Sequence, residues 1–254
     1  MRSLIALPLL LTACFSFAKP AVMADEPPPP GAFPHDLLDD ALAEYVDERG
    51  YIDYDGLRAD REPLDRYLGY VAAYSPRNDP ELFPTEDDAL AYYLNAYNAL
   101  AVRGVLDRPE MESVNDIKVD YFYYTRYSLG GRKVSLYKLE NGIIRDQFMD
   151  PRIHFYLNCQ SVSCPTFPRQ AIRADTLDSR LDAMTAAFVN DPDHVSVRDD
   201  GTVEMSSIFD WYAEDFQPAG GPLNFAREYR PELPANAEIA FKSYDWGLIE
   251  QSSP

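Results

Sequence analysis

The segment DPRIHFYLNCQSVSCP, residues 150–165, carries the side chains best suited to covalent chemistry in this chain. It holds Cys159 and Cys164, the only cysteines beyond the N-terminal region, and His154, one of three histidines. A cysteine thiolate is a strong nucleophile, and a nearby histidine can take the proton of the thiol. The segment therefore predicts a nucleophilic site with Cys159 as the thiolate and His154 as the base. Asn158 or a backbone N–H would stabilise the oxyanion.

The spacing within this segment restricts how such a dyad can form. Along a continuous strand, residues five apart point to opposite faces and lie roughly 16 Å apart. His154 and Cys159 are five apart. A direct contact between them therefore requires a sharp bend after Leu157.

The two cysteines also allow other chemistry. In an oxidising compartment, Cys159 and Cys164 could close a short disulfide loop that acts as a structural staple. With His154 and Glu140 they could supply a zinc set, but H-x4-C-x4-C matches no common ligand spacing. We therefore predict no metal and no other cofactor.

A further interpretation is a pocket that binds a ligand without reacting with it. Such a pocket would hold a small polar or anionic ligand through amides and guanidinium groups. The residues expected to line or support it are Asn95, Asn98, Glu140, Arg145, Arg152, Ser161 and Cys164. Ion pairs with the many carboxylates, or hydrogen bonds that hold a turn, are the alternative roles for these side chains.

The two asparagines lie on an unusual predicted helix, residues 86–106, with Thr85 as its N-cap. From residue 89 to 102 this helix has no charged side chain, which indicates that it is buried on all sides. A buried amide without a hydrogen bond costs roughly 1–3 kcal/mol. We expect Asn95 and Asn98 either to cap a neighbouring turn or to line a cavity, and to approach the cysteine segment.

The remaining patterns place these residues in an α+β domain. Apolar spacing predicts helices, a glycine in each of two short loops predicts hairpins, and an apolar run without alternation predicts a buried strand. The predicted helices are 36–47, 62–74, 137–145, 176–189 and a segment after Ser206; the hairpins are 121–136 and 194–205; the strands are 152–157 and 238–249. We expect one modest, mainly antiparallel sheet with helices packed around it. FDWYAEDF is expected to bury Trp211 and to expose its acids.

Composition limits the partners of the protein. The 254 residues have a formal charge of −19, which repels phosphate backbones and anionic membrane surfaces. We therefore expect no nucleic-acid partner. No segment after the N-terminus has the length and apolarity of a membrane span.

The N-terminal sequence predicts export. Residues 1–24 resemble a cleavable export signal, residues 25–34 form a proline-rich linker, and residues 35–254 form a single domain. The protein is then periplasmic or extracellular. LTAC, which ends at Cys14, resembles a lipobox, so a lipid anchor at Cys14 is the alternative to cleavage after Ala24.

Five ordered motifs carry a family resemblance: YYLNAYNAL, LENGIIR, DPRIHFYLNCQSVSCP, IFDWYAEDF and SYDW. Over roughly residues 40–250 the chain resembles domain-of-unknown-function family 547. The resemblance implies no established activity. Fusions of some members to thioredoxin- or glutaredoxin-like domains imply thiol chemistry. Members commonly have Glu-His where this chain has Glu140–Asn141, so a mechanism that needs a histidine there is not expected here.

Overall fold

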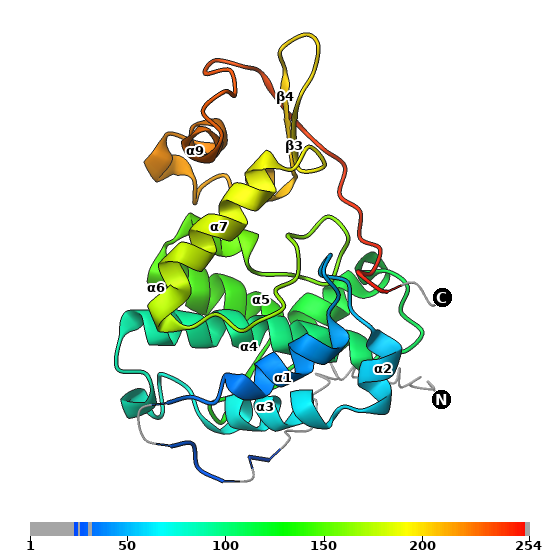
Figure 1. The fold of residues 1–254 in the computed structure, drawn as a ribbon, viewed down its shortest axis with the longest axis vertical. Coiled ribbons are helices and arrows are strands. Elements are labelled where there is room, and N and C mark those ends of the chain that lie inside the picture. Colours follow the sequence, from blue (N-terminus) through cyan, green and yellow to red (C-terminus); the bar gives the residue numbers. More distant parts are fainter. Residues whose placement is uncertain (1–22, 25, 30–31, 252–254) are drawn as a thin grey trace, which may run out of the picture.

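The computed structural model describes residues 23–24, 26–29 and 32–251 (Figure 1). Cys14 and nearly all of the predicted export signal lie outside these residues, so signal cleavage and lipidation remain predictions. The described chain forms helices and two small sheets, which confirms the predicted α+β class.

Helices supply most of the regular structure. The α-helices are α1 (Asp36–Tyr45), α2 (Tyr54–Ala59), α3 (Glu62–Ala73), α4 (Glu86–Leu106), α5 (Leu136–Leu139), α6 (Asp146–Phe148), α7 (Leu177–Asn190), α8 (Ile208–Trp211) and α9 (Pro222–Tyr229). The 3-10 helices are η1 (Pro80–Leu82), η2 (Val114–Ile117), η5 (Pro151–Phe155), η6 (Ala174–Thr176) and η7 (Gln217–Ala219); η3 (Asp120–Tyr124) and η4 (Glu140–Arg145) are π-helical.

The strands form two sheets rather than the single sheet expected. β1 (Tyr127–Leu129) and β2 (Arg132–Val134) make an antiparallel hairpin that turns at Gly130 and Gly131, as predicted. β3 (Val195–Val197) and β4 (Val203–Met205) make the second predicted hairpin, and β5 (Ile239–Phe241) adds to β4 in parallel.

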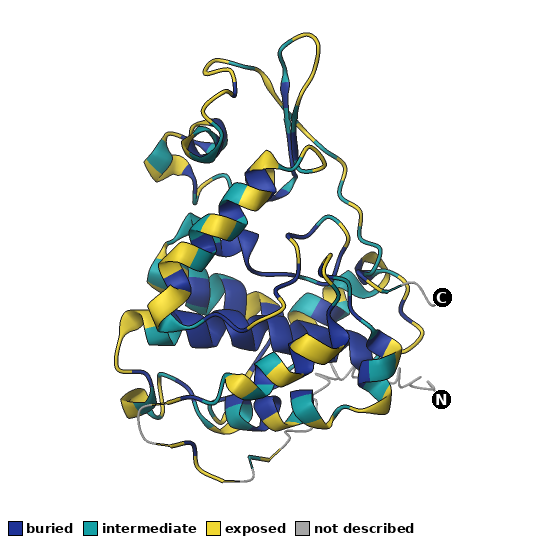
Figure 2. Cartoon of the chain, in the orientation of Figure 1, coloured by how far each residue is buried: buried dark blue, intermediate teal, exposed yellow. Residues whose placement is uncertain are grey.

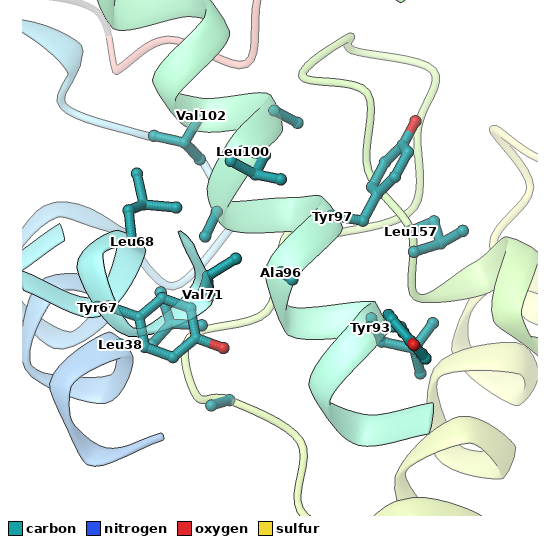
Figure 3. Close-up of a cluster of buried hydrophobic side chains, with 14 of the residues drawn as sticks. Leu38, Tyr67, Leu68, Val71, Tyr93, Ala96, Tyr97, Leu100, Val102 and Leu157 are labelled. Atoms are coloured by element: carbon teal, nitrogen blue, oxygen red, sulfur yellow. The ribbon is translucent and has the colours of Figure 1, made fainter. Parts of the chain in front are cut away.

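Helix α4 forms the centre of the larger core. Thr85 and Asp88 form a capping box that fixes its first turn, which confirms the predicted N-cap. Figure 3 shows Tyr67, Leu68 and Val71 on one side of the helix, and Tyr97 and Leu157 on the other. Because both sides are covered, every residue from Leu90 to Leu106 is buried (Figure 2).

The predicted strand at residues 152–157 is wrong, because this segment is the short helix η5. Pro151 occupies its first turn, and the Asp150 carboxylate accepts the backbone N–H of Arg152. Ile153 packs into the core around α4, whereas Phe155 packs into a second core with α7, α9 and the β3–β4 sheet. A segment that is buried on both faces shows no periodicity, so the sequence pattern did not distinguish helix from strand.

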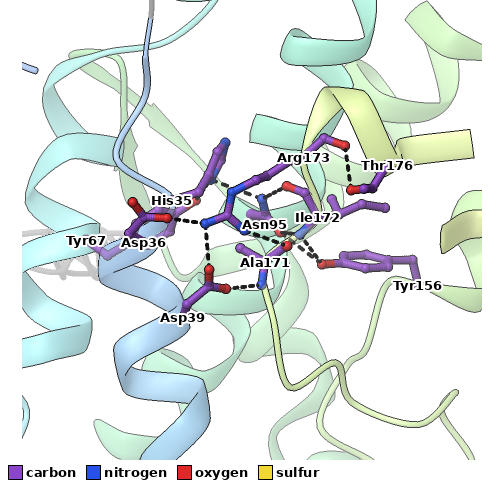
Figure 4. Close-up of polar contacts among 10 residues, drawn as sticks. All are labelled: His35, Asp36, Asp39, Tyr67, Asn95, Tyr156, Ala171, Ile172, Arg173 and Thr176. Atoms are coloured by element: carbon purple, nitrogen blue, oxygen red, sulfur yellow. Dashed lines mark hydrogen bonds and ion pairs between the residues drawn. The ribbon is translucent and has the colours of Figure 1, made fainter. Parts of the chain in front are cut away.

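Asn95 belongs to a polar network beside α1 (Figure 4). Its Nδ2 donates to the carbonyl of Ile172 at 2.8 Å and to Nδ1 of His35 at 3.1 Å. Its Oδ1 accepts the Tyr156 hydroxyl at 2.9 Å and the Ile172 N–H at 3.0 Å. Asn95 therefore joins α4 to the segment before α7 and lines no part of the cysteine site.

The same network predicts how stability depends on pH. Burial and the nearby Arg173 lower the pKa of His35 to about 4, and Nδ1 must stay unprotonated to accept from Asn95. Between pH 6.5 and 4, His35 is protonated in the unfolded chain but remains neutral in the folded protein. The free energy of unfolding therefore falls as the pH falls. We expect His35→Gln to flatten this dependence in urea unfolding measured across that range. An unchanged slope would contradict the assignment.

Candidate functional site

The cysteines lie on a tight turn that follows η5. Gln160 adopts a left-handed backbone conformation with φ of 75°, which is uncommon for a residue other than glycine. Its side chain is fully buried and accepts the Tyr54 hydroxyl at 2.9 Å. Asn158 closes the turn, because its Oδ1 accepts the Gln160 N–H at 2.7 Å and its Nδ2 donates to the Pro165 carbonyl at 2.6 Å.

Helix α4 holds this turn through Asn98. The Asn98 Oδ1 accepts the Asn158 N–H at 2.9 Å, and its Nδ2 donates to the Tyr156 carbonyl at 3.1 Å. Both amide groups are buried, so these two bonds satisfy donors and acceptors that water cannot reach. Asn98 therefore fixes the entry to the turn, and it is not among the residues that line the pocket beside it.

The closing segment of the chain covers the other side of the turn. The N–H groups of Val162 and Ser163 donate to the carbonyls of Gly247 and Asp245 at 2.8 and 3.1 Å. This pairing places Tyr244 against both sulfur atoms, with its hydroxyl 3.1 Å from Cys164 Sγ and 3.6 Å from Cys159 Sγ.

The two cysteines are free thiols in close contact. Their Sγ atoms are 2.7 Å apart, and the Cys159 N–H donates to Cys164 Sγ at 3.0 Å. Ser161 Oγ lies 3.3 Å from Cys159 Sγ. The turn thus brings together a dithiol and two hydroxyl groups.

These contacts separate the pKa values of the two thiols. Burial raises the pKa of Cys159, but hydrogen bonds from Cys164, Ser161 and Tyr244 outweigh burial, so the net change is downward. Burial and the neighbouring Cys159 sulfur raise the pKa of Cys164 well above its usual range. The first proton to leave the pair therefore leaves a thiolate on Cys159 that Cys164 stabilises.

Cys159 lies in a pocket of about 470 Å³ with a strongly aromatic lining. Its residues are Tyr97, Lys118, Phe122, Tyr123, Tyr137, Glu140, Asn141, Arg145, His154, Leu157, Cys159, Cys164, Ile208, Trp211, Tyr212, Tyr244 and Trp246. Both π-helical segments contribute to it. In an α-helix, Glu140 and Arg145 would point about 140° apart. In the wider π-helix both reach the pocket.

Two charged residues of the pocket, Glu140 and Arg145, are held by partners within the protein. Tyr212 donates its hydroxyl to Glu140 Oε1. Arg145 forms two hydrogen bonds of 2.7 Å with Asp215 and a third of 2.6 Å with Asn141 Oδ1. Asn141 thus helps to orient Arg145.

The predicted Cys159–His154 dyad is not formed. His154 Nε2 pairs with Asp215 at 2.7 Å, and its ring stacks on Tyr212 at 3.9 Å. Among the described residues, no hydrogen bond joins this ring to Cys159. The chain does turn after Leu157, but the turn directs the thiol toward Cys164 and Tyr244 instead.

Two further expectations differ from the structure. The Asn158 side chain is fully occupied in closing the turn, so it is not placed to stabilise an oxyanion. Arg152 points away from the pocket, because its guanidinium pairs with Asp150, Asp178 and Asp182. The role of Asn158 is therefore structural. Arg152 forms the ion pairs that the sequence analysis gave as its alternative role.

Several residues in or near the pocket were not predicted from the sequence. Trp211 is 46% exposed at the pocket rather than buried, and Asp215 is partly buried beneath it. Lys118 and Tyr244 lie on segments more than 40 residues from the cysteines along the chain. The SYDW and FDWYAEDF motifs were the available signals, since both place aromatic residues beside acids.

The described residues contain neither a metal-binding group nor a membrane-spanning helix. In the part of the chain that the structure describes, no three His, Cys, Asp or Glu side chains gather as a metal-binding group. No described helix has the length and apolarity to cross a bilayer.

Asp215 gives a second pH-dependent prediction. Burial raises its pKa, but hydrogen bonds from His154 and Arg145 lower it well below its usual range. A carboxylate with a depressed folded-state pKa stabilises the fold above the unfolded value of about 3.9, and this contribution is lost as the pH falls further. We expect Asp215→Asn to lower the free energy of unfolding at pH 7 by about 2 kcal/mol and to weaken its decline between pH 5 and 2. Urea unfolding tests this, with exposed Asp210→Asn as the matched control; equal losses in both variants would contradict it.

Fold and site together define an α+β protein with a dithiol at the floor of an aromatic pocket. A model of the family described as "Protein of unknown function, DUF547" matches residues 82–189. This match supports the resemblance that the sequence motifs carry, over a shorter range than residues 40–250, and the matched segment includes α4, η4 and both cysteines. Neither a curated protein nor a solved structure matches the chain significantly.

Proposed function

We propose that the protein is a thiol-dependent acyl-transfer enzyme, a hydrolase or an acyltransferase, with Cys159 as its nucleophile. The observation that supports this most directly is the environment of the Cys159 sulfur. It lines the pocket and contacts three side chains that can donate hydrogen bonds to a thiolate. A thiol whose pKa is lowered ionises more readily without a separate base, so the proposal does not need the His154 contact.

The proposed reaction uses both sulfur atoms. The Cys159 thiolate adds to the carbonyl carbon of the substrate, and the bond to the leaving group breaks as that group takes the proton of the Cys164 thiol. A thioester on Cys159 and a thiolate on Cys164 result. Water or an acceptor hydroxyl or amine then gives its proton to Cys164 and adds to the thioester, which releases the acyl product and restores the Cys159 thiolate.

His154 has a positioning role in this scheme. It lies between Asp215 and the ring of Tyr212, and Tyr212 in turn donates to Glu140. The stack holds Glu140 and Arg145 at the pocket wall through shared partners. These side chains shape the pocket wall, while the reacting atoms meet at the turn.

Acyl capture tests the proposal. The reduced full chain is mixed with p-nitrophenyl acetate, quenched in acid, and analysed by peptide mass spectrometry. We expect one acetyl group on the peptide that carries Cys159 in the unmodified protein and none there in Cys159→Ser. Cys164→Ala should still acquire the acetyl group but release it more slowly. Absence of acetyl-Cys159, or equal labelling of exposed lysines and Cys159, would contradict the proposal.

A second candidate is a non-catalytic ligand-binding domain in which Cys159 and Cys164 form a disulfide. The sulfur–sulfur separation of 2.7 Å favours it, since a small movement would bring the atoms to the bonded distance of about 2.05 Å. Thiol titration of the native mature protein separates the two candidates. A free, alkylatable Cys159 supports the enzyme, whereas thiols that appear only after reduction support the staple.

We also propose that the protein is exported. The apolar segment after Arg2 and the cleavage sequence before Asp25 support this. Terminal sequencing of protein made in a bacterial host tests it. A mature N-terminus at Asp25 supports cleavage, a lipidated Cys14 supports the anchored form, and an intact Met1 in the cytoplasm contradicts export.

A further inference from the structure

We propose that the pocket selects acyl substrates that carry an anionic group beside an aromatic or similarly flat body. This inference deepens the proposed function. It rests on that function only in stating that the bound ligand reacts; the binding of the ligand does not depend on it. The ligand class itself follows from three features of the pocket: a cation without a carboxylate partner, other charges that are paired within the protein, and an aromatic wall.

The cation is Lys118, which directly follows η2. Its Nζ lies 3.7 Å from the centroid of the Trp246 ring and 5.6 Å from that of Trp211. Within the described residues it has no hydrogen bond and no carboxylate within 4.0 Å. The chain has 42 acidic and 23 basic side chains, so carboxylate partners are abundant in general. Holding this ammonium on indole rings instead leaves it available to a ligand.

The other charges at the pocket wall are already satisfied. Glu140 accepts from Tyr212, and Arg145 and His154 share Asp215. An anionic ligand would have to displace Asp215 to bind Arg145, which would leave a partly buried carboxylate unpaired. Binding at Lys118 breaks no such pair.

Lys118 and Cys159 also affect each other electrostatically. Burial lowers the pKa of Lys118, and the negative charge of a Cys159 thiolate opposes that change. The ammonium and the sulfur therefore face the same pocket within range of each other's field. A ligand anchored by its anionic group at Lys118 can present a carbonyl carbon to Cys159.

The walls near Lys118 are aromatic. The Trp211 and Trp246 rings are stacked, with centroids 5.5 Å apart and planes at 22°. Tyr244 lies within 4.7 Å of Trp211 and 4.5 Å of Trp246, centroid to centroid. Although Trp211 faces the pocket, it is 46% exposed, so the outer part of the wall is an uncovered aromatic surface. Flat ligands gain most from such a surface, because rings stack on it.

Fluorescence excited selectively at tryptophan reports on this site alone, because the two tryptophans of the chain are Trp211 and Trp246. We would titrate Cys159→Ser with benzoate, and with benzamide and acetate as probes that lack the charge or the ring. This variant binds without reacting. We expect a saturable fluorescence change with benzoate, at least tenfold weaker apparent affinity for benzamide and for acetate, and weaker benzoate binding at high salt.

Lysine variants in the same background test the role of Lys118. Lys118→Gln should weaken benzoate binding at least tenfold, Lys118→Arg should retain it, and Lys133→Gln, an exposed lysine on β2, should have no effect. Thermal unfolding would show that each variant is folded. Equal binding of benzoate and benzamide, no saturable signal, or unchanged binding in Lys118→Gln would overturn the inference. The acetylation of Cys159 is measured in a separate experiment. Failure of the binding inference can therefore be distinguished from failure of the proposed function.

Discussion

Replacing Cys164 with alanine should slow alkylation of Cys159 by iodoacetamide several-fold at a pH below the Cys159 pKa. The Cys164 thiol is the strongest of the hydrogen-bond donors that lower the pKa of Cys159. Its removal leaves Ser161 and Tyr244 as donors, so the Cys159 pKa should rise. The experiment uses reduced protein and locates the label by peptide mass spectrometry.

Two comparisons make this prediction specific. Tyr244→Phe should slow the reaction less, since its hydroxyl lies 3.6 Å from the Cys159 sulfur, farther than Cys164 Sγ at 2.7 Å. At a pH well above both pKa values, Cys164→Ala and the unmodified protein should react at similar rates, because Cys159 is then ionised in both. A deficit that persists unchanged at high pH would indicate altered access rather than altered ionisation, and would contradict the electrostatic explanation.

Asn98→Ala should lower the free energy of unfolding by about 3 kcal/mol and loosen the cysteine turn. The substitution leaves the Asn158 N–H and the Tyr156 carbonyl buried without their partner. Each such group costs roughly 1–3 kcal/mol. Urea unfolding at pH 7 measures the loss, and hydrogen exchange of the Asn158 amide measures the loosening.

Asn236→Ala is the matched control, because Asn236 is an exposed asparagine and should change the free energy of unfolding by less than about 0.5 kcal/mol. Asn95→Ala offers a second comparison. It should cost similar stability, yet leave Asn158 exchange protected and Cys159 reactivity unchanged, because Asn95 supports the segment at Ile172. If Asn98→Ala left exchange at Asn158 unchanged, the assignment of Asn98 to the turn would be wrong.

The main helices could be located from the sequence because their capping residues and apolar spacing are local signals. Thr85 and Asp88 specify the start of α4, and the uncharged segment that follows correctly indicated burial on all sides. The segment 152–157 was assigned to a strand because its two faces pack into different cores, which only the tertiary structure reveals. The π-helical widening at residues 140–145 likewise had no sequence signal.

The chemistry of the site was only partly predictable for a similar reason. Cys159 and Cys164 stand out by type and spacing, so the sequence could single them out as candidates. Their partners could not, because Tyr244 lies 80 residues beyond Cys164 and Asp215 lies 61 residues beyond His154. Histidine was the obvious base from the sequence, but the carboxylate that engages it is visible only in the folded chain.

The central claim is that the turn lowers the pKa of the Cys159 thiol and raises the pKa of the Cys164 thiol. The most direct test is the rate of Cys159 alkylation by iodoacetamide as a function of pH in the reduced, unmodified protein. The structure predicts a half-maximal rate clearly below the ordinary cysteine pKa of about 8.5, with Cys164 unlabelled over the same range. A midpoint at or above about 8.5, or equal labelling of the two thiols, would contradict it.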